Sequence, residues 1–517
     1  MEIEKLLAGI LKPIDKFLNN ITMYRLVLYG LILLSTVPFV LSVLGLLPYT
    51  LIELGLSMVI VSAVCFAVNE VVARVLKAQT NIESVSITSL ILFLVIQPVV
   101  SEQSAYLLAA GCAVAMLSKF VLAFKKRHIF NPAAVGIFFI SLFSGAAIWW
   151  VSSIAMLPFL VIIGFLVLRK LKRFEVAAIF VLASFVPIII NSAVSGFTIR
   201  EIIAVLIQLL TSWPTIFFAS IMLTEPFTIP GTSKLRVAYA AITGLLFNAV
   251  FVIGPIESSP QLALLLGNLF TWATGLKKRI VLTLEEKTEL APETYQFKFT
   301  APEAVKFIPG QYLELTLPHK NSDDRGNRRY FTIASSPNEK TLNLGIKFIT
   351  PPSSYKQNLK ELAPGKELVV GQIAGDFSLP KELDHDLVFM AGGIGITPFR
   401  SILQYMIETN DKRKVTLFYG CNKMNDIPYK DFLDAAEKKL NLKVVYVVAD
   451  KESVPADWSG ETGFVTAEIL KKYVHNFITP IFYISGPGVM VDIFKKMLFG
   501  FNVSSKQLRT DYFPGFA

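Results

Sequence analysis

Three side chains that can contact a bound cofactor lie close together at residues 329–332. Arg329, Phe331 and Thr332 belong to a run that a turn of small residues closes. Successive side chains of a β-strand point to opposite faces, so Arg329 and Phe331 share one face. A guanidinium there can bind a diphosphate, a ring can cover an aromatic cofactor, and a hydroxyl can hydrogen-bond its edge. An ordinary surface strand explains this run alone about as well.

Two glycine-rich turns further along the chain can bind phosphates. The first, Gly-Gly-Ile-Gly-Ile at 392–396, follows an apolar strand and precedes a helix that begins near Pro398. The second, Ser-Gly-Pro-Gly at 485–488, also follows an apolar strand, and a helix begins near Val489. Glycines let a backbone approach a pyrophosphate, and a helix N-terminus supplies N–H donors. Two such turns in a strand–helix alternation predict a doubly wound nucleotide-binding sheet.

In order and spacing these motifs resemble the ferredoxin–NADP reductase family over residues from about 280 to 517. The resemblance implies an antiparallel FAD-binding β-barrel at 277–382 and an α/β doubly wound NAD(P)-binding domain at 383–517. Phe331 replaces the tyrosine of the family's Arg-x-Tyr-Ser box, and Ser485 replaces its usual cysteine. The residues that the resemblance assigns to FAD or NAD(P)H are Arg329, Tyr330, Phe331, Thr332, Lys347, Ser353, Ser354, Gly392, Gly393, Gly395, Thr397, Pro398, Gly486 and Pro487.

Two residues are expected at the reacting atoms. Thr332 is the candidate for a hydrogen bond near the reactive edge of the flavin. Phe516 or Phe513, in the aromatic C-terminal tail, is the candidate to cover the other face of the flavin, although packing at a domain edge explains it nearly as well. Hydride transfer needs no acid or base from the protein, which orients the nicotinamide over the flavin. The sequence does not separate NADH from NADPH.

Composition places much of the chain in a membrane. The 517 residues have a mean hydropathy of +0.56, and the apolar excess lies in the first half. The net charge of +10 fits basic cytoplasmic loops better than a nucleic-acid partner. Three cysteines cannot build a disulfide framework or a four-thiolate iron–sulfur cluster, and no metal site is predicted.

The first half predicts a polytopic α-helical domain at 23–276. Basic residues gather in the connections on one side, and only Arg200 lies in an outer connection, which predicts a multi-pass cell (inner) membrane protein with both termini cytoplasmic. Residues 1–22 carry apolar residues at helical spacing and are expected to lie on the membrane surface. About ten apolar segments are predicted to span, at 26–47, 51–73, 86–100, 105–124, 133–150, 153–168, 174–190, 201–224, 237–254 and 260–274.

Proline interrupts two of these segments in equivalent places. The third ends at Gln97-Pro98 and the eighth at Glu225-Pro226, which predicts an inverted repeat with a site near the bilayer centre. A proline that merely ends each helix is an equally good explanation. Asn131 is expected as a helix N-cap before Pro132. Lys119 lies in an apolar stretch and either snorkels to the inner face or contacts an anionic cofactor.

These pieces resemble the D subunit of Rnf complexes and the B subunit of sodium-translocating NADH:quinone oxidoreductases, over most of residues 50–255. That family carries FMN esterified to a threonine in a Ser-Gly-Ala-Thr box. Here Ser195-Gly196-Phe197-Thr198 is only a distorted match in a later loop, and an ordinary loop is the better interpretation. The resemblance makes Lys119, Asn131, Thr198 and Glu225 candidates for a membrane cofactor, a second flavin (FMN or riboflavin) that is expected to be noncovalent.

Together these features predict a membrane-bound flavin oxidoreductase that passes electrons from cytoplasmic NAD(P)H through FAD to a membrane flavin, a quinone or a redox protein. Haem is not expected, because the membrane half has one histidine, His128, and each haem needs axial ligands. Two alternatives stay open: a redox-driven Na⁺ or H⁺ transporter, and a plain flavin or ferredoxin reductase on a membrane anchor. Membrane lipid is an expected partner, nucleic acid is not, and the oligomeric state is not predicted.

Overall fold

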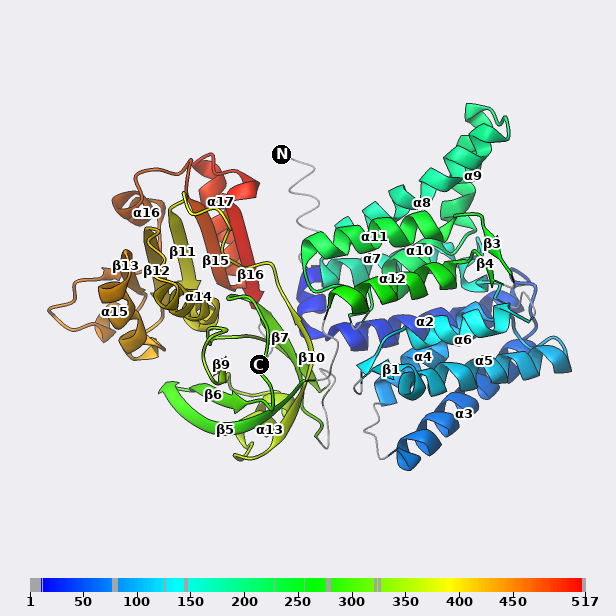
Figure 1. The fold of residues 1–517 in the computed structure, drawn as a ribbon, viewed down its shortest axis with the longest axis horizontal. Helices are drawn as coiled ribbons and strands as arrows, with labels where there is room; N and C mark the ends of the chain where they lie inside the picture. Colours follow the sequence, from blue (N-terminus) through cyan, green and yellow to red (C-terminus); the bar gives the residue numbers. More distant parts are fainter. Residues whose placement is uncertain are drawn as a thin grey trace. The chain divides into compact units, whose positions relative to one another are not determined.

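Helices make up the first part of the chain, and strands organise the second (Figure 1). The structure is a computed structural model that describes residues 11, 13–76, 82–124, 127–143, 147–226, 228–254, 256–275, 280–319, 323 and 327–513. The chain divides into two units near residue 280. We call them the helical unit and the sheet unit and consider each by itself.

The helical unit contains a set of apolar helices joined by short connections. Its helices are α2 (Met23–Val43), α3 (Leu51–Val75), α4 (Ile82–Val95), α5 (Glu102–Val121), α6 (Pro132–Ser141), α7 (Leu157–Leu171), α8 (Phe174–Val194), α9 (Ile199–Thr211), α10 (Thr215–Phe217), α11 (Ser233–Phe247) and α12 (Pro260–Thr274). Its shorter elements are the 3₁₀ turn η1 (Trp150–Ser152), the π-helix η2 (Phe218–Met222), and the strands β1 (Ala123–Phe124), β2 (Arg127–His128), β3 (Val252–Ile253) and β4 (Ile256–Glu257).

The prediction of about ten spans is not supported. Among the described residues, four helices are long and apolar enough to cross a membrane, namely α2, α3, α5 and α8. A fifth counts if α9 and the segment from Thr215 to Met222, bent by 56°, form one span. The other predicted segments also contain helices, but α4, α6, α7, α11 and α12 have 10 to 15 residues. Such helices are only about 15–23 Å long, which is shorter than the hydrocarbon core of a typical bilayer. The predicted segments were longer because hydropathy records apolar composition and not where a helix ends.

One order of elements occurs twice in the helical unit. An apolar helix ends before Gln97-Pro98, and α5, the β1–β2 hairpin and α6 follow. Later η2 ends before Glu225-Pro226, and α11, the β3–β4 hairpin and α12 follow. Proline stands at the start of both last helices. This recurrence supports two related halves, while their inverted orientation stays a prediction.

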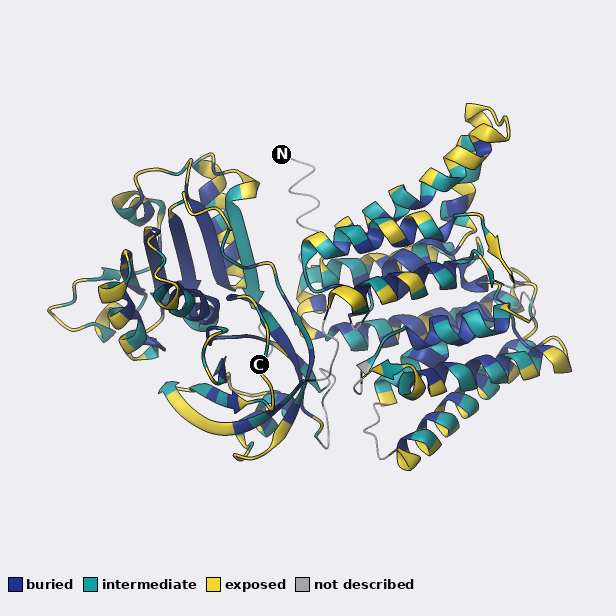
Figure 2. Ribbon diagram, in the orientation of Figure 1, coloured by how far each residue is buried: buried dark blue, intermediate teal, exposed yellow. Residues whose placement is uncertain are grey.

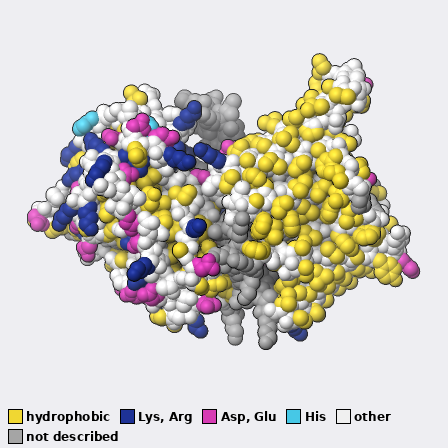
Figure 3. Space-filling view, in the orientation of Figure 1, with side chains coloured by type: hydrophobic (Ala, Val, Ile, Leu, Met, Phe, Trp, Pro, Cys, Tyr) yellow, Lys and Arg dark blue, Asp and Glu magenta, His cyan; other side chains and the backbone are white. Residues whose placement is uncertain are grey.

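The surface of the helical unit suits a lipid environment. In the space-filling view hydrophobic side chains cover most of it, whereas charged side chains are scattered over the sheet unit (Figure 3). On α3 and α8, Val59 and Val194 are 64% and 84% exposed. At the N-terminus, residues 13–20 are helical, and the Arg169 guanidinium of α7 pairs with the Asp15 carboxylate at 2.7 Å. Residues 1–10 and 12 of the predicted surface helix lie outside the described residues.

The sheet unit begins with an antiparallel barrel. Its strands run in the order β8-β7-β10-β5-β6-β9, and a bridge between Ile333 and Leu344 joins the two edge strands. Alternate strand residues such as Phe297 and Phe299 are fully buried inside it. The bounds are β5 (Ile280–Ala291), β6 (Thr294–Thr300), β7 (Tyr312–Thr316), β8 (Arg328–Thr332), β9 (Leu342–Lys347), β10 (Glu367–Ala374) and α13 (Ser354–Lys360).

A parallel sheet follows, in the order β14-β13-β12-β11-β15-β16, and helices cover both faces (Figure 2). Phe389 packs toward the helices of one face and Met390 toward those of the other, which explains the continuous apolar run. The bounds are β11 (Leu387–Gly392), β12 (Val415–Cys421), β13 (Leu442–Val448), β14 (Glu461–Thr462), β15 (Ile481–Pro487), β16 (Leu508–Phe513), α14 (Thr397–Glu408), α15 (Lys430–Lys439), α16 (Ala467–Tyr473) and α17 (Gly488–Gly500), with 3₁₀ turns η3 (Gly393–Ile396), η4 (Met424–Asp426), η5 (Lys451–Ser453) and η6 (Ser505–Gln507).

The order of strands reverses between β11 and β15, where the chain leaves β11 toward one side and β15 toward the other. Both predicted glycine turns lie at the carboxyl ends of these two strands. In doubly wound sheets such a switch point is where ligands bind. The fold therefore brings the two turns side by side.

Candidate functional site

The first group of candidate residues lies on β8, at one edge of the barrel. Arg329 is 5% exposed, and its guanidinium carbon lies 4.9 Å from the centre of the Tyr355 ring. The Phe331 ring lies 6.1 Å from the same ring, so both side chains share one face of the strand. Tyr330 points to the other face, where it is half-exposed and contacts Tyr312 edge-to-face.

Sequence reasoning missed Tyr355, which joins β8 to α13. It is fully buried, and its hydroxyl donates to the Leu315 carbonyl at 3.0 Å. Burial raises the pKa of the Tyr355 hydroxyl well above its ordinary value, although the Arg329 charge acts in the opposite direction. The phenol therefore stays neutral and remains a donor. The only signal for it in the sequence is its place directly after Ser353 and Ser354.

The start of α13 carries the next candidates. Ser353 caps the helix by accepting from the Lys356 N–H at 3.2 Å, and the Lys347 carbonyl accepts from the Lys356 ammonium at 2.8 Å. The Asp323 carboxylate accepts from the Ser354 N–H at 3.0 Å, and the Ser354 hydroxyl accepts from the Asp323 N–H at 2.9 Å. A diphosphate bound here would compete with the Asp323 carboxylate, because both are anions that need the same N–H.

The first glycine turn links β11 to α14. Gly393 has φ +53°, and an added Cβ would meet nothing within 4 Å, so open space borders the turn. The Gly393 carbonyl accepts from the Tyr419 hydroxyl at 3.0 Å, which fixes the turn to the neighbouring strand β12. A Cβ on Gly395 would clash with the Ser485 carbonyl, and one on Gly392 would clash with Met490. Gly393 is thus favoured by its positive φ and Gly395 by the close Ser485 backbone, whereas the flexible Met490 side chain can move away from a Cβ at Gly392.

Helix α14 begins directly after this turn. Thr397 and Pro398 are its first two residues, and the Thr397 hydroxyl donates to the Ile394 carbonyl at 3.1 Å. Proline is well suited to this position because its missing N–H has no helical partner there. The Thr397 N–H donates to the Ile394 carbonyl of η3, and the positive potential of the helix N-terminus favours an anion near the end of β11.

Three polar side chains from three strands meet at the switch point. Ser485 on β15 pairs in register with Ala391 on β11 and with Asp511 on β16. The Asp511 carboxylate accepts from the Thr332 hydroxyl of β8 at 3.4 Å. The Ser485 hydroxyl is fully buried and has no hydrogen-bond partner among the described residues. Sequence reasoning missed Asp511, which only tertiary structure brings to Thr332.

Gly486 and Pro487 complete β15 beside this cluster, in register with the last residues of β16. Phe516, the candidate to cover the flavin, lies outside the described residues. The assignment of Phe516 therefore stays a prediction.

Two of the membrane candidates hydrogen-bond each other, and the other two have different hydrogen-bond partners. Asn131 caps α6, and its amide donates to the Glu225 carboxylate at 2.7 Å. The Thr228 hydroxyl donates to the same carboxylate at 3.1 Å. Lys119 donates to the Ser84 carbonyl at 3.3 Å. Thr198 is exposed and caps α9 in a reciprocal pair with Glu201, a structural role that explains its hydroxyl.

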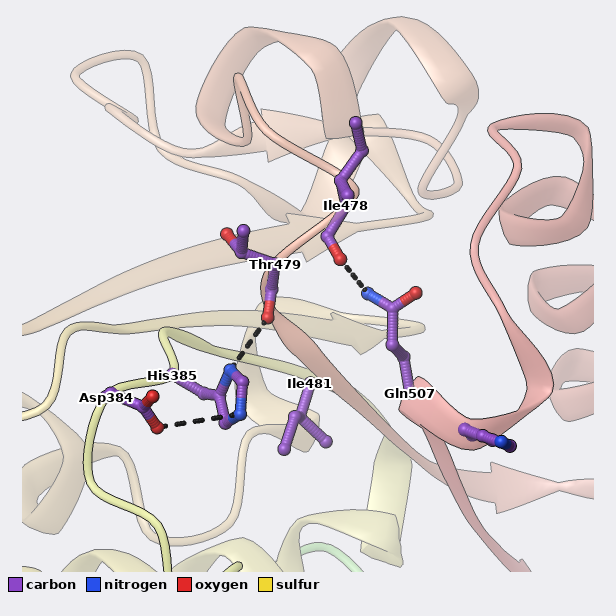
Figure 4. Close-up of a pocket in the computed structure, with 7 residues that line it drawn as sticks. Asp384, His385, Ile478, Thr479, Ile481 and Gln507 are labelled. Atoms are coloured by element: carbon purple, nitrogen blue, oxygen red, sulfur yellow. Dashed lines mark hydrogen bonds and ion pairs between the residues drawn. The ribbon is translucent and has the colours of Figure 1, made fainter.

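A cavity of about 400 Å³ lies elsewhere, at the amino ends of the parallel strands and away from the switch point (Figure 4). It is found where β11, β15 and β16 begin, whereas ligands of such sheets bind where the strands end. The Gln507 amide donates to the Ile478 carbonyl at 2.6 Å, and the His385 ring contacts the Thr479 carbonyl at 3.2 Å. These side chains are engaged with the backbone, so we place the functional site at the switch point instead.

Comparisons with known proteins identify two domains in the sheet unit. Residues 281–378 match the family model of the oxidoreductase FAD-binding domain, and residues 389–496 match that of the oxidoreductase NAD-binding domain. The F subunit of the Na(+)-translocating NADH-quinone reductase of Actinobacillus pleuropneumoniae is 32% identical over 36% of this chain and 49% of that protein. The protein of the same name in Neisseria meningitidis is 32% identical over the same shares. The chain thus spans about half the length of the curated relatives that it matches.

Solved structures match part of the chain with low sequence identity. The flavohem-like FAD/NAD-binding domain of nitric oxide dioxygenase from Vibrio cholerae is 18% identical, with a TM-score of 0.41 over 45% of this chain and 98% of that domain. A ferredoxin NADP⁺ reductase from Neisseria gonorrhoeae is 20% identical, with a TM-score of 0.39 over 45% of this chain and 98% of that protein. The two domain matches identify the sheet unit as an FAD- and NAD-binding reductase module.

Proposed function

We propose that the chain is a membrane-bound, FAD-containing oxidoreductase that takes electrons from NAD(P)H. The observation that carries the proposal is the contact between Thr332 on the FAD-binding barrel and Asp511 on the NAD-binding sheet, beside Ser485. This contact joins the end of the predicted flavin strand to the switch point that the glycine turns border. It is where a flavin edge and a nicotinamide would have to meet.

The residues present fit both groups. The buried Ser485 hydroxyl lacks a partner among the described residues. It can donate a hydrogen bond to a nicotinamide amide or accept one from it. Open space at Gly393 leaves room for a dinucleotide over the α14 N-terminus. On the barrel, Arg329 and Phe331 offer a cation and a ring on one face. When bound, FAD supplies the redox chemistry by accepting a hydride from NAD(P)H.

The roles of the protein groups follow from these positions. Arg329 and the first turn of α13 hold the flavin diphosphate, and Phe331 covers the flavin. Thr332 donates a hydrogen bond at the flavin edge, and Asp511 orients the Thr332 hydroxyl. The turn at Gly392–Ile396 binds the dinucleotide phosphates through backbone N–H groups. This division of roles needs no proton transfer to or from the protein.

The acceptor is a quinone, a second flavin or a redox protein reached through the helical unit. The apolar surface of that unit and its four candidate spans support a membrane location. The relatives named as an NADH-quinone reductase component favour a quinone or a redox partner in a membrane complex. A second flavin, FMN or riboflavin, would be noncovalent, because Thr198 is explained by its helix cap. On this proposal the sheet unit and both termini lie in the cytoplasm.

The decisive experiment is a flavin analysis of the detergent-purified full chain, followed by anaerobic mixing with NADH or NADPH. We expect about one FAD per chain, bleached by at least one of the two dinucleotides. Protein without FAD, or FAD that neither dinucleotide reduces, would overturn the proposal. Flavin that stays with the acid-precipitated pellet and disappears in Thr198→Ala would contradict the noncovalent assignment.

Paired variants test the contact that carries the proposal. Thr332→Val and Asp511→Ala should keep FAD and lower the rate of its reduction, because each removes one side of the same hydrogen bond. Arg509→Ala is the matched control, since Arg509 lies on the same strand as Asp511 and its guanidinium donates to backbone carbonyls. Equal rates in all three variants would show that the contact has no part in hydride transfer.

A further inference from the structure

A hairpin joins β8 and β9, the two strands that carry candidate FAD-binding residues. It contacts α14, the helix that follows the first glycine turn. The hairpin, residues 333–341, runs from the end of β8 to the start of β9. The Ser401 hydroxyl of α14 donates to the Ser335 carbonyl at 2.6 Å, and the Arg400 guanidinium donates to the Ala334 carbonyl at 3.1 Å. Arg400 also forms an ion pair with Glu339. We call this set of contacts the hairpin latch.

The far end of α14 holds the same hairpin. The Glu408 carboxylate accepts from the Ser336 hydroxyl, and it accepts from the Asn338 amide at 3.0 Å. The latch thus contacts the helix at its first turn and again at its last residue, Glu408. Two separated points of attachment fix both the position and the tilt of α14 relative to the barrel.

Arg400 is less exposed and has more contacts than a typical surface arginine. Its side chain is 13% exposed, and that of Glu339 is 21% exposed. Its guanidinium carbon also lies 4.9 Å from the centre of the Phe432 ring on α15. Contacts with a carbonyl, a carboxylate and a ring hold the Arg400 guanidinium in one orientation. Removing the guanidinium leaves these partners without their interactions.

A second contact brings β9 directly against the glycine turn. A Cβ built on Gly345 would lie 2.7 Å from the Thr397 methyl, 2.7 Å from the Tyr429 hydroxyl and 3.4 Å from Ile394. The backbone of the flavin-binding strand β9 therefore touches the first residue of α14. This contact and the latch lie on the same two elements, so they brace the same joint between barrel and sheet.

We propose that Arg400 is a positioning residue, which through the hairpin latch sets where the dinucleotide turn lies relative to the flavin strands. The inference rests on the proposed function, because it assigns Arg400 a role in that same hydride transfer. Reacting atoms must come within about 3–3.5 Å, and a displacement of about 1 Å can cost roughly 100-fold in rate. Arg400 acts through the hairpin and the helix that it joins, and not by binding the cofactor itself.

The test is rapid-mixing reduction of the FAD in the purified full chain, with Arg400→Ala compared with the unmodified protein. We expect unchanged FAD content, a dissociation constant for the dinucleotide within a few-fold, and a rate of reduction at saturating dinucleotide lower by roughly 10- to 100-fold. The absorbance band of the nicotinamide–flavin complex should weaken as well, a change that a loss of stability alone does not produce. Arg400→Lys keeps the charge but not the fork, so its rate should lie between the two.

Arg413→Ala is the matched control. Arg413 is a buried arginine of the same domain, paired with Asp411, and its other contacts are the carbonyls of Pro380 and Glu382. The variant should lose stability without a specific fall in the reduction rate. A second variant, Glu339→Gln, keeps the inference testable if Arg400→Ala does not fold, and it should slow reduction in the same way. In the double variant the two losses should not add, because both break one ion pair.

The outcomes separate the inference from the proposed function. Unchanged reduction rates in Arg400→Ala and Glu339→Gln overturn the positioning role, as does an equal fall in Arg413→Ala. If the unmodified protein contains no FAD, or if NAD(P)H does not reduce it, the proposed function itself fails. A loss of FAD in Arg400→Ala would instead show that the latch holds the barrel together, which also overturns the inference.

Discussion

Glycine serves different purposes in the two units. In the helical unit, a Cβ on Gly136 would lie 2.8 Å from the Ala115 methyl, and one on Gly244 would lie 2.8 Å from the Ala183 methyl. Those glycines let helices approach closely, as small residues do in membrane-embedded bundles. In the sheet unit, Gly393 has φ +53° and meets nothing within 4 Å. At these positions the same residue type allows close helix packing in one unit and leaves open space in the other.

One polar site of each unit shows a further difference, although buried side-chain atoms without a hydrogen-bond partner occur among the described residues of both units. In the helical unit, the Asn131 amide donates to the Glu225 carboxylate. In the sheet unit, the Ser485 hydroxyl is buried without a partner among the described residues. A buried polar group left without a partner costs roughly 1–3 kcal/mol, so its persistence at a strand end points to a ligand.

The largest effect is expected for Arg329→Ala. The variant loses a charge-assisted contact to the flavin diphosphate worth about 1.5–3 kcal/mol, which weakens FAD binding by roughly 10- to 150-fold. The FAD content after gel filtration measures the effect. Full retention of FAD would place the flavin site elsewhere in the sheet unit. Arg509→Ala again serves as the control.

A smaller effect is expected for Gly393→Val, which should keep FAD and slow its reduction by roughly 10- to 100-fold. A β-branched side chain at φ +53° crowds the dinucleotide phosphates, and the backbone strain alone costs about 1–2 kcal/mol. Gly365→Val is the control, because Gly365 also has a positive φ and open space but lies in a barrel loop. Similar reduction rates in both variants would remove the distinction between ligand space and ordinary turns.

The reverse pattern is expected for Gly136→Val in the helical unit. Overpacking against the Gly111 backbone and Ala115 should destabilise the unit by about 1–3 kcal/mol and leave the reduction of FAD by NAD(P)H unchanged. Thermal unfolding in detergent, followed together with flavin bleaching, checks both parts. The comparison between the units fails if bleaching slows while stability is unaffected.

The smallest effect concerns Cys421 at the end of β12. Burial, the largest cause, raises the pKa of the Cys421 thiol to about 12, although the Tyr419 hydrogen bond acts in the opposite direction. A raised pKa keeps the group protonated throughout neutral pH, and the reactive thiolate forms only as the pH approaches that value. Iodoacetamide at a pH of about 8 should therefore not label Cys421 in the folded protein but should label it after denaturation. Rapid labelling of the native chain would contradict the burial of this strand end.

Where the sequence predicted the local structure of the candidate residues correctly, local patterns were enough. Alternation along residues 329–332 places Arg329 and Phe331 on one face, because the period of a strand is two. The glycine turns lie between strands and helices, and Asn131 caps a helix before proline. In each case the cause lies within a few neighbouring residues, so composition and spacing carry the information.

Tertiary structure decided the rest. Asp511 meets Thr332 across 179 residues, and Tyr355 contacts both Arg329 and Phe331, because chain topology and not spacing brings them together. Hydropathy also did not predict helix length, since α4 already ends at Val95 and the eighth predicted segment is broken between Thr211 and Thr215. The sequence by itself determined which local elements form and which residue types they carry. Only the packing of those elements decided which side chains meet, since contacts between distant residues depend on the whole fold.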